Sequence, residues 1–211
     1  MKFFLLKRSA RQDNKIPLDA SDKHPGCVLV NCESCDTHGV WPKNKADRVD
    51  IEVVIRDVAH LDDIEQAFTT LLGSQTVQEV VNHNNLTGME FYSPLGYSID
   101  TTKQGAEQMV AQCRDELRFQ VMHVVGRGGS IAESSDVHLA KSCSLCGWEE
   151  WSQPENGIIV DESQWDGSDF FYVNEFGAML MSERAVDILR SARLSNYGDS
   201  PAEEFQPAFG V

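Results

Sequence analysis

The sequence predicts an α+β fold, with a mixed, mostly antiparallel sheet and about three helices. Short apolar or alternating segments indicate strands, and apolar residues spaced three and four apart indicate helices. With 211 residues, of which 41% are apolar and 24% charged, the chain is long enough to bury a core of its own. We therefore expect a single α+β domain over residues 1–211.

Strands are predicted from period-two alternation and from short apolar runs. The clearest lies over residues 119–125, where apolar and polar side chains alternate. The others are expected at 1–8, 27–30, 49–58, 158–160 and 170–173, with short strands or an ordered loop over 86–100. Residues 197–211 contain two prolines and are expected to lie over the surface as a tail.

Helices are predicted where an apolar stripe meets a capping residue. Two stripes are well defined: residues 61–72, which end at Gly73, and the segment that Ser182 caps, which the apolar run 178–181 precedes. The other candidates are a short helix opening with the Thr76–Glu79 capping box and one that begins at Thr101 or Thr102 and buries Cys113.

The cysteines suggest a metal site. Four of the six form two Cys-x-x-Cys turns far apart in the chain, and each turn offers half of the ligand shell of a tetrahedral zinc ion. The predicted ligands of one zinc ion are Cys32, Cys35, Cys143 and Cys146. The site would form a zinc-ribbon or knuckle-like lobe from about 27–41 and 138–152, joining the N-terminal and C-terminal parts. Because four cysteines close the shell, the zinc is expected to be structural.

Other uses of these cysteines stay open. His38 lies three residues beyond Cys35 and could replace one cysteine as a ligand. A Cys-x-x-Cys turn can also be a redox pair, although a redox motif needs only one such turn. Disulfides are a further alternative, which a reducing compartment disfavours. The role of Cys27, which belongs to neither turn, is not set by this pattern.

Two further motifs resemble catalytic or binding sites. Residues 126–130 form a glycine-rich loop after a strand, but they lack the Gly-Lys-Ser/Thr ending of a P-loop and the GxGxxG spacing, so we interpret them as a mobile loop. Ser135, Asp136 and His138 supply the residue types of a hydrolytic triad. Nearness in sequence does not give a triad its geometry, and we interpret them as the polar approach to the second cysteine turn.

Net charge and the length of the apolar runs argue against two classes of partner. It is −15, which argues against nucleic acid because phosphates are bound by lysine and arginine. No apolar run approaches the roughly 20 residues of a membrane span. The opening apolar run of four residues is also shorter than the roughly 7–15 of a signal peptide. We therefore expect a cytoplasmic protein that binds neither nucleic acid nor membrane.

The negative charge is concentrated in the last third of the chain, where 13 acidic residues face three arginines from residue 148 onward. Three tryptophans are interleaved with these acids. The segment is either a solvated surface with tryptophans packed beneath it, or an acidic face with aromatic anchors for a basic partner. The candidate partner-binding residues are Trp148, Glu149, Glu150, Trp151, Asp161, Glu162, Trp165 and Asp166.

Together, these features resemble the double-CXXCG motif family. The resemblance rests on the two cysteine turns, the second of which continues with Gly147, on the chain length, on the acidic aromatic segment that follows and on the helix start 181–184. The first turn departs from the pattern because Asp36 stands where the family has glycine. Members of that family are bacterial immunity proteins, made beside polymorphic or contact-exchanged toxins to protect the producer.

The resemblance implies a non-enzymatic immunity protein that occludes a cognate toxin domain, basic in charge and encoded by a neighbouring gene. Two rival hypotheses remain. One is a zinc-dependent enzyme that reverses the toxin's damage, which would need a metal with an open coordination position. The other is a zinc-ribbon adapter for protein interactions in transcription or translation, which would need a basic face that this chain does not display.

Overall fold

The computed structural model describes residues 1–8, 18–20, 27–42, 51–55, 61–67, 70–99, 119–177 and 179–205. Over these ranges the fold is α+β with mostly antiparallel sheets, as predicted. The described residues carry two α-helices rather than about three: α1 (Gln75–His83) and α3 (Glu183–Ala192). The predicted helix after Thr101 lies outside the described residues, together with Cys113.

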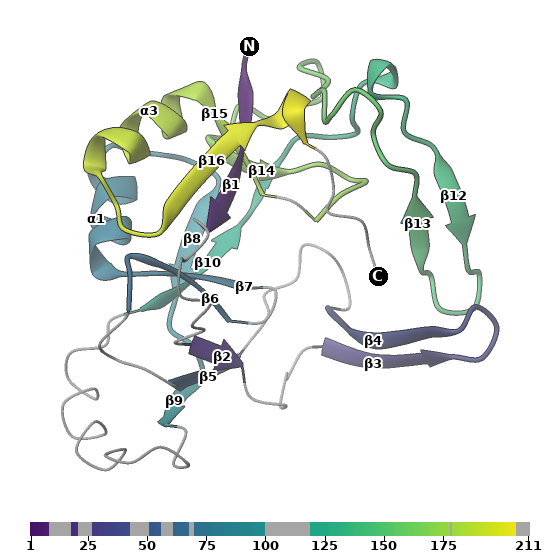
Figure 1. Cartoon of the computed structure of the whole chain (residues 1–211), viewed down its shortest axis with the longest axis horizontal. Coiled ribbons are helices and arrows are strands. Elements are labelled where there is room, and N and C mark those ends of the chain that lie inside the picture. Colours follow the sequence, from purple (N-terminus) through teal and green to yellow (C-terminus); the bar gives the residue numbers. More distant parts are fainter. Residues whose placement is uncertain are drawn as a thin grey trace.

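A five-stranded sheet forms the centre of the fold, with both helices beside it and two hairpins at the opposite end of the molecule (Figure 1). The strand order is β11, β14, β15, β1, β16, and all neighbours are antiparallel except β11 and β14. The strands are β1 (Phe3–Arg8), β11 (Gly126–Arg127), β14 (Phe170–Tyr172), β15 (Leu180–Ser182) and β16 (Tyr197–Pro201).

Strand β1 is buried on both faces, which explains why its sequence is an apolar run rather than an alternation. Phe4 and Leu6 enter a core shared with both helices. Phe3 and Leu5 enter a second core on the other face of the sheet, which also contains Phe171. Each of the four side chains is at most 8% exposed. The N-terminal strand therefore links the two apolar cores.

Two smaller sheets complete the body. The four-stranded antiparallel sheet has the order β6, β7, β10, β8, and the three-stranded sheet has the order β2, β5, β9. In the latter, β2 and β5 are antiparallel and β5 and β9 are parallel. The strands are β6 (Ile64–Ala67), β7 (Thr70–Gly73), β8 (Met89–Tyr92), β10 (Gln120–Val124), β2 (Leu18–Ala20), β5 (Glu52–Ile55) and β9 (Gly96–Ile99).

The helix predicted over residues 61–72 is wrong, because this segment forms the β6–β7 hairpin. Ile64 packs into the core beside the helices, and Leu71 packs against that core, whereas its neighbour Leu72 is fully buried outside that cluster. A hairpin with apolar residues on both faces thus imitates a helical stripe. Gly73 is not a helix cap: a Cβ there would lie 3.2 Å from Met122 Sδ.

Both helices begin at serine caps. Ser182 Oγ accepts a hydrogen bond from Ala185 N, as predicted for α3. Helix α1 begins two residues earlier than the Thr76–Glu79 capping box suggested, because Ser74 Oγ accepts from Val77 N and donates to Asp63 Oδ1 at 2.8 Å. Ser74 therefore caps the helix and connects it to the preceding loop.

Three further predictions, a strand, a surface tail and a mobile loop, also need correction. Residues 158–160 are not a strand, since only Val160 makes an isolated bridge, to Ile131. The segment at 197–201 is not a surface tail but the edge strand β16, paired with β1. The glycine-rich segment begins as β11, and a Cβ on Gly126 would lie 2.1 Å from Phe170 O. Close backbone packing thus explains its glycine, so the mobile-loop interpretation is wrong for Gly126–Arg127.

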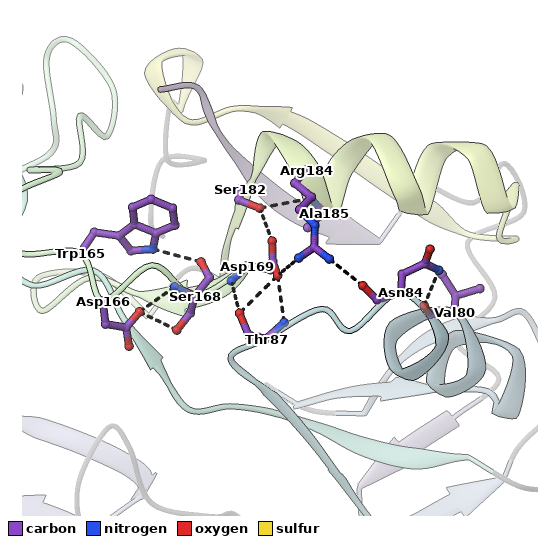
Figure 2. Close-up of polar contacts among 10 residues, drawn as sticks. All are labelled: Val80, Asn84, Thr87, Trp165, Asp166, Ser168, Asp169, Ser182, Arg184 and Ala185. Atoms are coloured by element: carbon purple, nitrogen blue, oxygen red, sulfur yellow. Dashed lines mark hydrogen bonds and ion pairs between the residues drawn. The ribbon is translucent and has the colours of Figure 1, made fainter.

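Asp169 connects β14, α3 and the loop after α1 (Figure 2). Its carboxylate accepts hydrogen bonds from Thr87 N at 2.9 Å and from Ser182 Oγ at 2.8 Å, and it forms an ion pair with Arg184 at 2.6 Å. Arg184 also donates to Asn84 O. Because Asp169 is 5% exposed, these donors satisfy a buried charge and fix the start of α3 against the end of α1.

We expect Asp169→Ala to lower the free energy of unfolding by about 2–4 kcal/mol, since it leaves several donors without their acceptor. Asp187, exposed on the same helix, provides the control, and Asp187→Ala should change stability by at most about 0.5 kcal/mol. Urea unfolding followed by circular dichroism measures both. Equal losses in the two variants would show that Asp169 has no special structural role.

Candidate metal centre

Two hairpins bring the cysteine turns together at one end of the molecule, away from α1 and α3 (Figure 1). The first consists of β3 (Cys27–Cys32) and β4 (Thr37–Pro42), and the second of β12 (Leu139–Ser142) and β13 (Glu149–Trp151). Each Cys-x-x-Cys turn lies at the closed end of its hairpin. We call these two hairpins with their turns the cysteine lobe.

The four predicted ligand atoms form one compact group. The Sγ atoms of Cys32, Cys35, Cys143 and Cys146 all lie within 4.8 Å of one another. Cys32 Sγ lies 3.7 Å from Cys143 Sγ, and Cys35 Sγ lies 3.6 Å from Cys146 Sγ. A tetrahedral zinc ion with Zn–S bonds of about 2.3 Å would place its sulfurs about 3.8 Å apart. The cluster is therefore compatible with metal binding.

The same distances bear on the alternatives. All four cysteines are free, and their closest sulfurs are separated by much more than the roughly 2.05 Å of a disulfide bond. A redox Cys-x-x-Cys pair needs only one turn, whereas the sulfurs of both turns meet in this cluster. The side chains of His38 and Cys27 lie outside the described residues, so their predicted roles stay predictions.

Each turn ends in a left-handed residue. Gly147 has φ 72° and Asp36, at the equivalent position of the first turn, has φ 53°. In the second turn, Gly147 N donates to Cys143 O and Cys143 N donates to Trp148 O, both at 2.8 Å. Aspartate is among the few non-glycine residues that adopt this conformation readily. Asp36 therefore reproduces the backbone that glycine provides in the second turn.

Backbone amides prepare the second turn to carry negative charge. The N–H groups of Cys146 and Leu145 lower the pKa of the Cys143 thiol to about 6. At Cys146, the Trp148 N–H acts in the same direction, but burial and the neighbouring sulfurs outweigh it and raise the pKa to about 12. The Cys143 thiolate therefore forms readily, and its charge disfavours ionisation of the Cys146 thiol. A bound cation would favour the ionised form of both thiols.

The eight candidate partner-binding residues occupy two regions. Trp148, Glu149, Glu150 and Trp151 lie on the second hairpin of the cysteine lobe. Glu149 is exposed there, and Glu150 forms an ion pair with Lys141 at 2.9 Å. Trp151 is half-buried, opposite Leu139 in the hairpin.

The other four lie in the loop before β14 and make contacts within the chain. Trp165 packs edge-on against Phe3, with ring centroids 5.2 Å apart, and its Nε1 donates to Ser168 O. The three carboxylates of this loop all accept hydrogen bonds. Asp161 accepts from Ser163 and Gln164, Asp166 accepts from Ser168 and Arg127 N, and Glu162 accepts from the Met1 amine. These hydrogen bonds lower the pKa of Asp161.

The triad residue types are not assembled into a nucleophile and base. Ser135 is buried, and its Oγ accepts from Ile159 N at 2.9 Å. Asp136 ends a 3₁₀ turn, η2 (Glu133–Ser135), in a left-handed conformation. His138 is exposed, and its backbone pairs with Ser152 at the base of the second hairpin. Ser135 thus pairs with the backbone of Ile159, and the interpretation of the three residues as a polar approach to the second cysteine turn stays a prediction.

Comparison with known proteins adds no relatives: no protein-family model and no curated protein matches the sequence. Among the described helices, none is long and apolar enough to cross a membrane. The fold and the site thus define an α+β protein with a four-cysteine cluster compatible with metal binding.

The positive φ of Asp36 predicts that this position accepts glycine but not a β-branched residue. We expect Asp36→Gly to leave the free energy of unfolding unchanged or to raise it by up to about 1 kcal/mol, and Asp36→Val to lower it by about 1–2 kcal/mol. Ser34, exposed in the same turn without a positive φ, serves as the control, and Ser34→Val should be nearly neutral. If Asp36→Val is as stable as Ser34→Val, the turn does not need this conformation.

Proposed function

We propose that Cys32, Cys35, Cys143 and Cys146 hold one structural zinc ion. Support comes from the donor set, which is entirely sulfur, and from separations near those of a tetrahedral site. Four protein ligands fill the tetrahedron and leave no position for substrate, so the ion would contribute folding free energy rather than chemistry. A reducing cytoplasm, where thiols stay free, suits such a site.

We expect the purified protein to contain one zinc ion per chain, with four sulfurs at about 2.3 Å by X-ray absorption spectroscopy. Chelation should raise hydrogen exchange in residues 139–151, while β1 and α3 keep their protection, because these two elements belong to the apolar cores.

Two variants sharpen the zinc experiment. Cys143→Ser should lose the metal, whereas Ser144→Ala, which changes an exposed neighbour, should retain it. A spectrum with three sulfurs and one nitrogen would instead favour His38 as a ligand. Protein that lacks metal and still protects residues 139–151 would contradict the structural role.

The function that these observations favour is inhibition by binding: an immunity protein that occludes a cognate toxin domain. One observation carries this proposal. The two cysteine turns, whose paired cysteines are 111 residues apart, meet at one four-sulfur cluster, and both end in the left-handed residue typical of a CXXCG turn. The helix start at 182–184 also has a structural role, since Ser182 and Arg184 both contact Asp169. The resemblance to the double-CXXCG family rests on these two cysteine turns and this helix start.

The acidic surface supports the choice of partner. Net charge of −15 would steer a basic toxin domain into contact and would repel nucleic acid. A closed four-sulfur shell supports binding over catalysis at this site. The protein would act in the cytoplasm of the producing cell.

Co-expression tests this function directly. The chain should rescue growth of cells that express the C-terminal toxin domain encoded by the neighbouring gene, and the two purified proteins should form a one-to-one complex. Cys143→Ser should weaken rescue, because it releases one arm of the cysteine lobe, while Ser144→Ala should rescue fully. If the unmodified chain neither rescues growth nor associates with the toxin domain, the immunity function is ruled out.

A further inference from the structure

Leu145 is the most exposed large apolar side chain in the described part of the molecule, at 76%. It lies between the two cysteines of the second turn, at the end of a hairpin. The equivalent position in the first turn is Ser34, a polar residue that is also exposed. The turn therefore has no structural need for leucine. A single exposed leucine is ordinary on a protein surface, so the residues near Leu145 decide what it can contact.

Three exposed acidic residues lie in the same lobe as this leucine. Glu33 and Asp36 are exposed on the first turn, on either side of Cys35, whose sulfur lies 3.6 Å from that of Cys146, the residue after Leu145. Glu149 is exposed at the start of β13. The sulfur cluster thus brings together the two turns beside which these three acidic residues and the leucine lie.

The negative charge of this group is not neutralised within the lobe. Lys141 is the one lysine or arginine in the segments 27–42 and 139–151, and it is paired with Glu150. No ion pair among the described residues engages Glu33, Asp36 or Glu149. The tip of the lobe therefore presents net negative charge around an apolar side chain.

The strand edge beside the tip is poorly suited to pairing with another strand. Strand β12 is exposed along its whole length and pairs only with β13 among the described strands. Its register shifts between Leu139 and Lys141, and Lys141 places a charge on the edge. Irregularity and lysine are the features that prevent edge-to-edge pairing. Contact through the side chains of the tip is the better alternative.

We infer that the tip of the cysteine lobe, formed by Leu145 with Glu33, Asp36 and Glu149, is the docking surface for a basic protein partner. Leucine would fill a small apolar depression of that partner, and the three carboxylates would face its lysines and arginines. This inference rests on the proposed immunity function and locates its contact surface. It places the contact in the lobe rather than at the loop 161–166, whose acidic and aromatic side chains make contacts within the chain.

Two pairs of variants test the inference in the full-length, zinc-loaded protein. Leu145→Ser copies the residue of the first turn, and Leu95→Ser is its control, a leucine 58% exposed just before β9. Glu33→Lys with Glu149→Lys reverses charge at the tip, and Glu79→Lys does so on α1, at the far side of the molecule from the lobe (Figure 1). Zinc content and thermal unfolding should match those of the unmodified chain.

Binding to the purified toxin domain encoded by the neighbouring gene is measured by surface plasmon resonance at low and high salt. Leu145→Ser should weaken binding about tenfold or more, mainly through faster dissociation. The double lysine variant should slow association and reduce its dependence on salt. Both controls should stay within about twofold of the unmodified chain, as expected for residues outside an interface.

The outcomes separate the two proposals. If the unmodified chain binds and both tip variants bind equally well, the docking surface is wrong and the immunity function stands. If the controls weaken binding as much as the tip variants, the surface is again wrong. If the unmodified chain does not bind, the proposed function fails and the docking surface fails with it.

Discussion

The convergence of four sulfur atoms is the constraint on which the cysteine lobe depends. The second hairpin of the lobe has little apolar core of its own: β12 is exposed throughout, and β13 is exposed or half-buried. Isolated two-stranded hairpins are marginal in water. Cys32 and Cys143 are both buried, and their sulfurs lie 3.7 Å apart. A ligand shell shared with the first hairpin would thus replace the packing that the second hairpin lacks.

The body of the protein follows a different rule. Its central strand β1 is buried on both faces, and Asp169 connects the sheet to both helices through a satisfied buried carboxylate. Apolar burial of this kind is independent of any metal. The fold therefore combines a body stabilised by packing with a lobe in which four sulfurs converge, where the proposed metal would add its coordination bonds. The Met1 amine contacts Glu162 in the loop before β14, so the chain start is also tied to the body.

Sequence patterns predicted those features that depend on local chemistry. Cysteine spacing identified the four residues whose sulfurs cluster, and Ser182 marked the start of α3, because metal ligation and capping use residue types at fixed offsets. The β6–β7 hairpin was missed because its apolar residues serve both faces of a sheet, which removes the period-two signal. Asp36 was read as a departure from the CXXCG pattern, although its tolerance of positive φ was available from residue type alone.

Charge in the C-terminal third illustrates why composition alone could not locate a surface. The carboxylates of Asp161 and Asp166 already accept hydrogen bonds from nearby N–H and hydroxyl groups, and Glu150 forms an ion pair with Lys141. Carboxylates satisfied in this way are poor partners for an incoming lysine, because binding it would exchange one interaction for another. Glu149 has no such ion pair in the described structure. The neighbours that folding places beside a carboxylate therefore decide whether it orders a loop or stays available for a partner. Composition does not contain that information, because the neighbours come from distant parts of the chain.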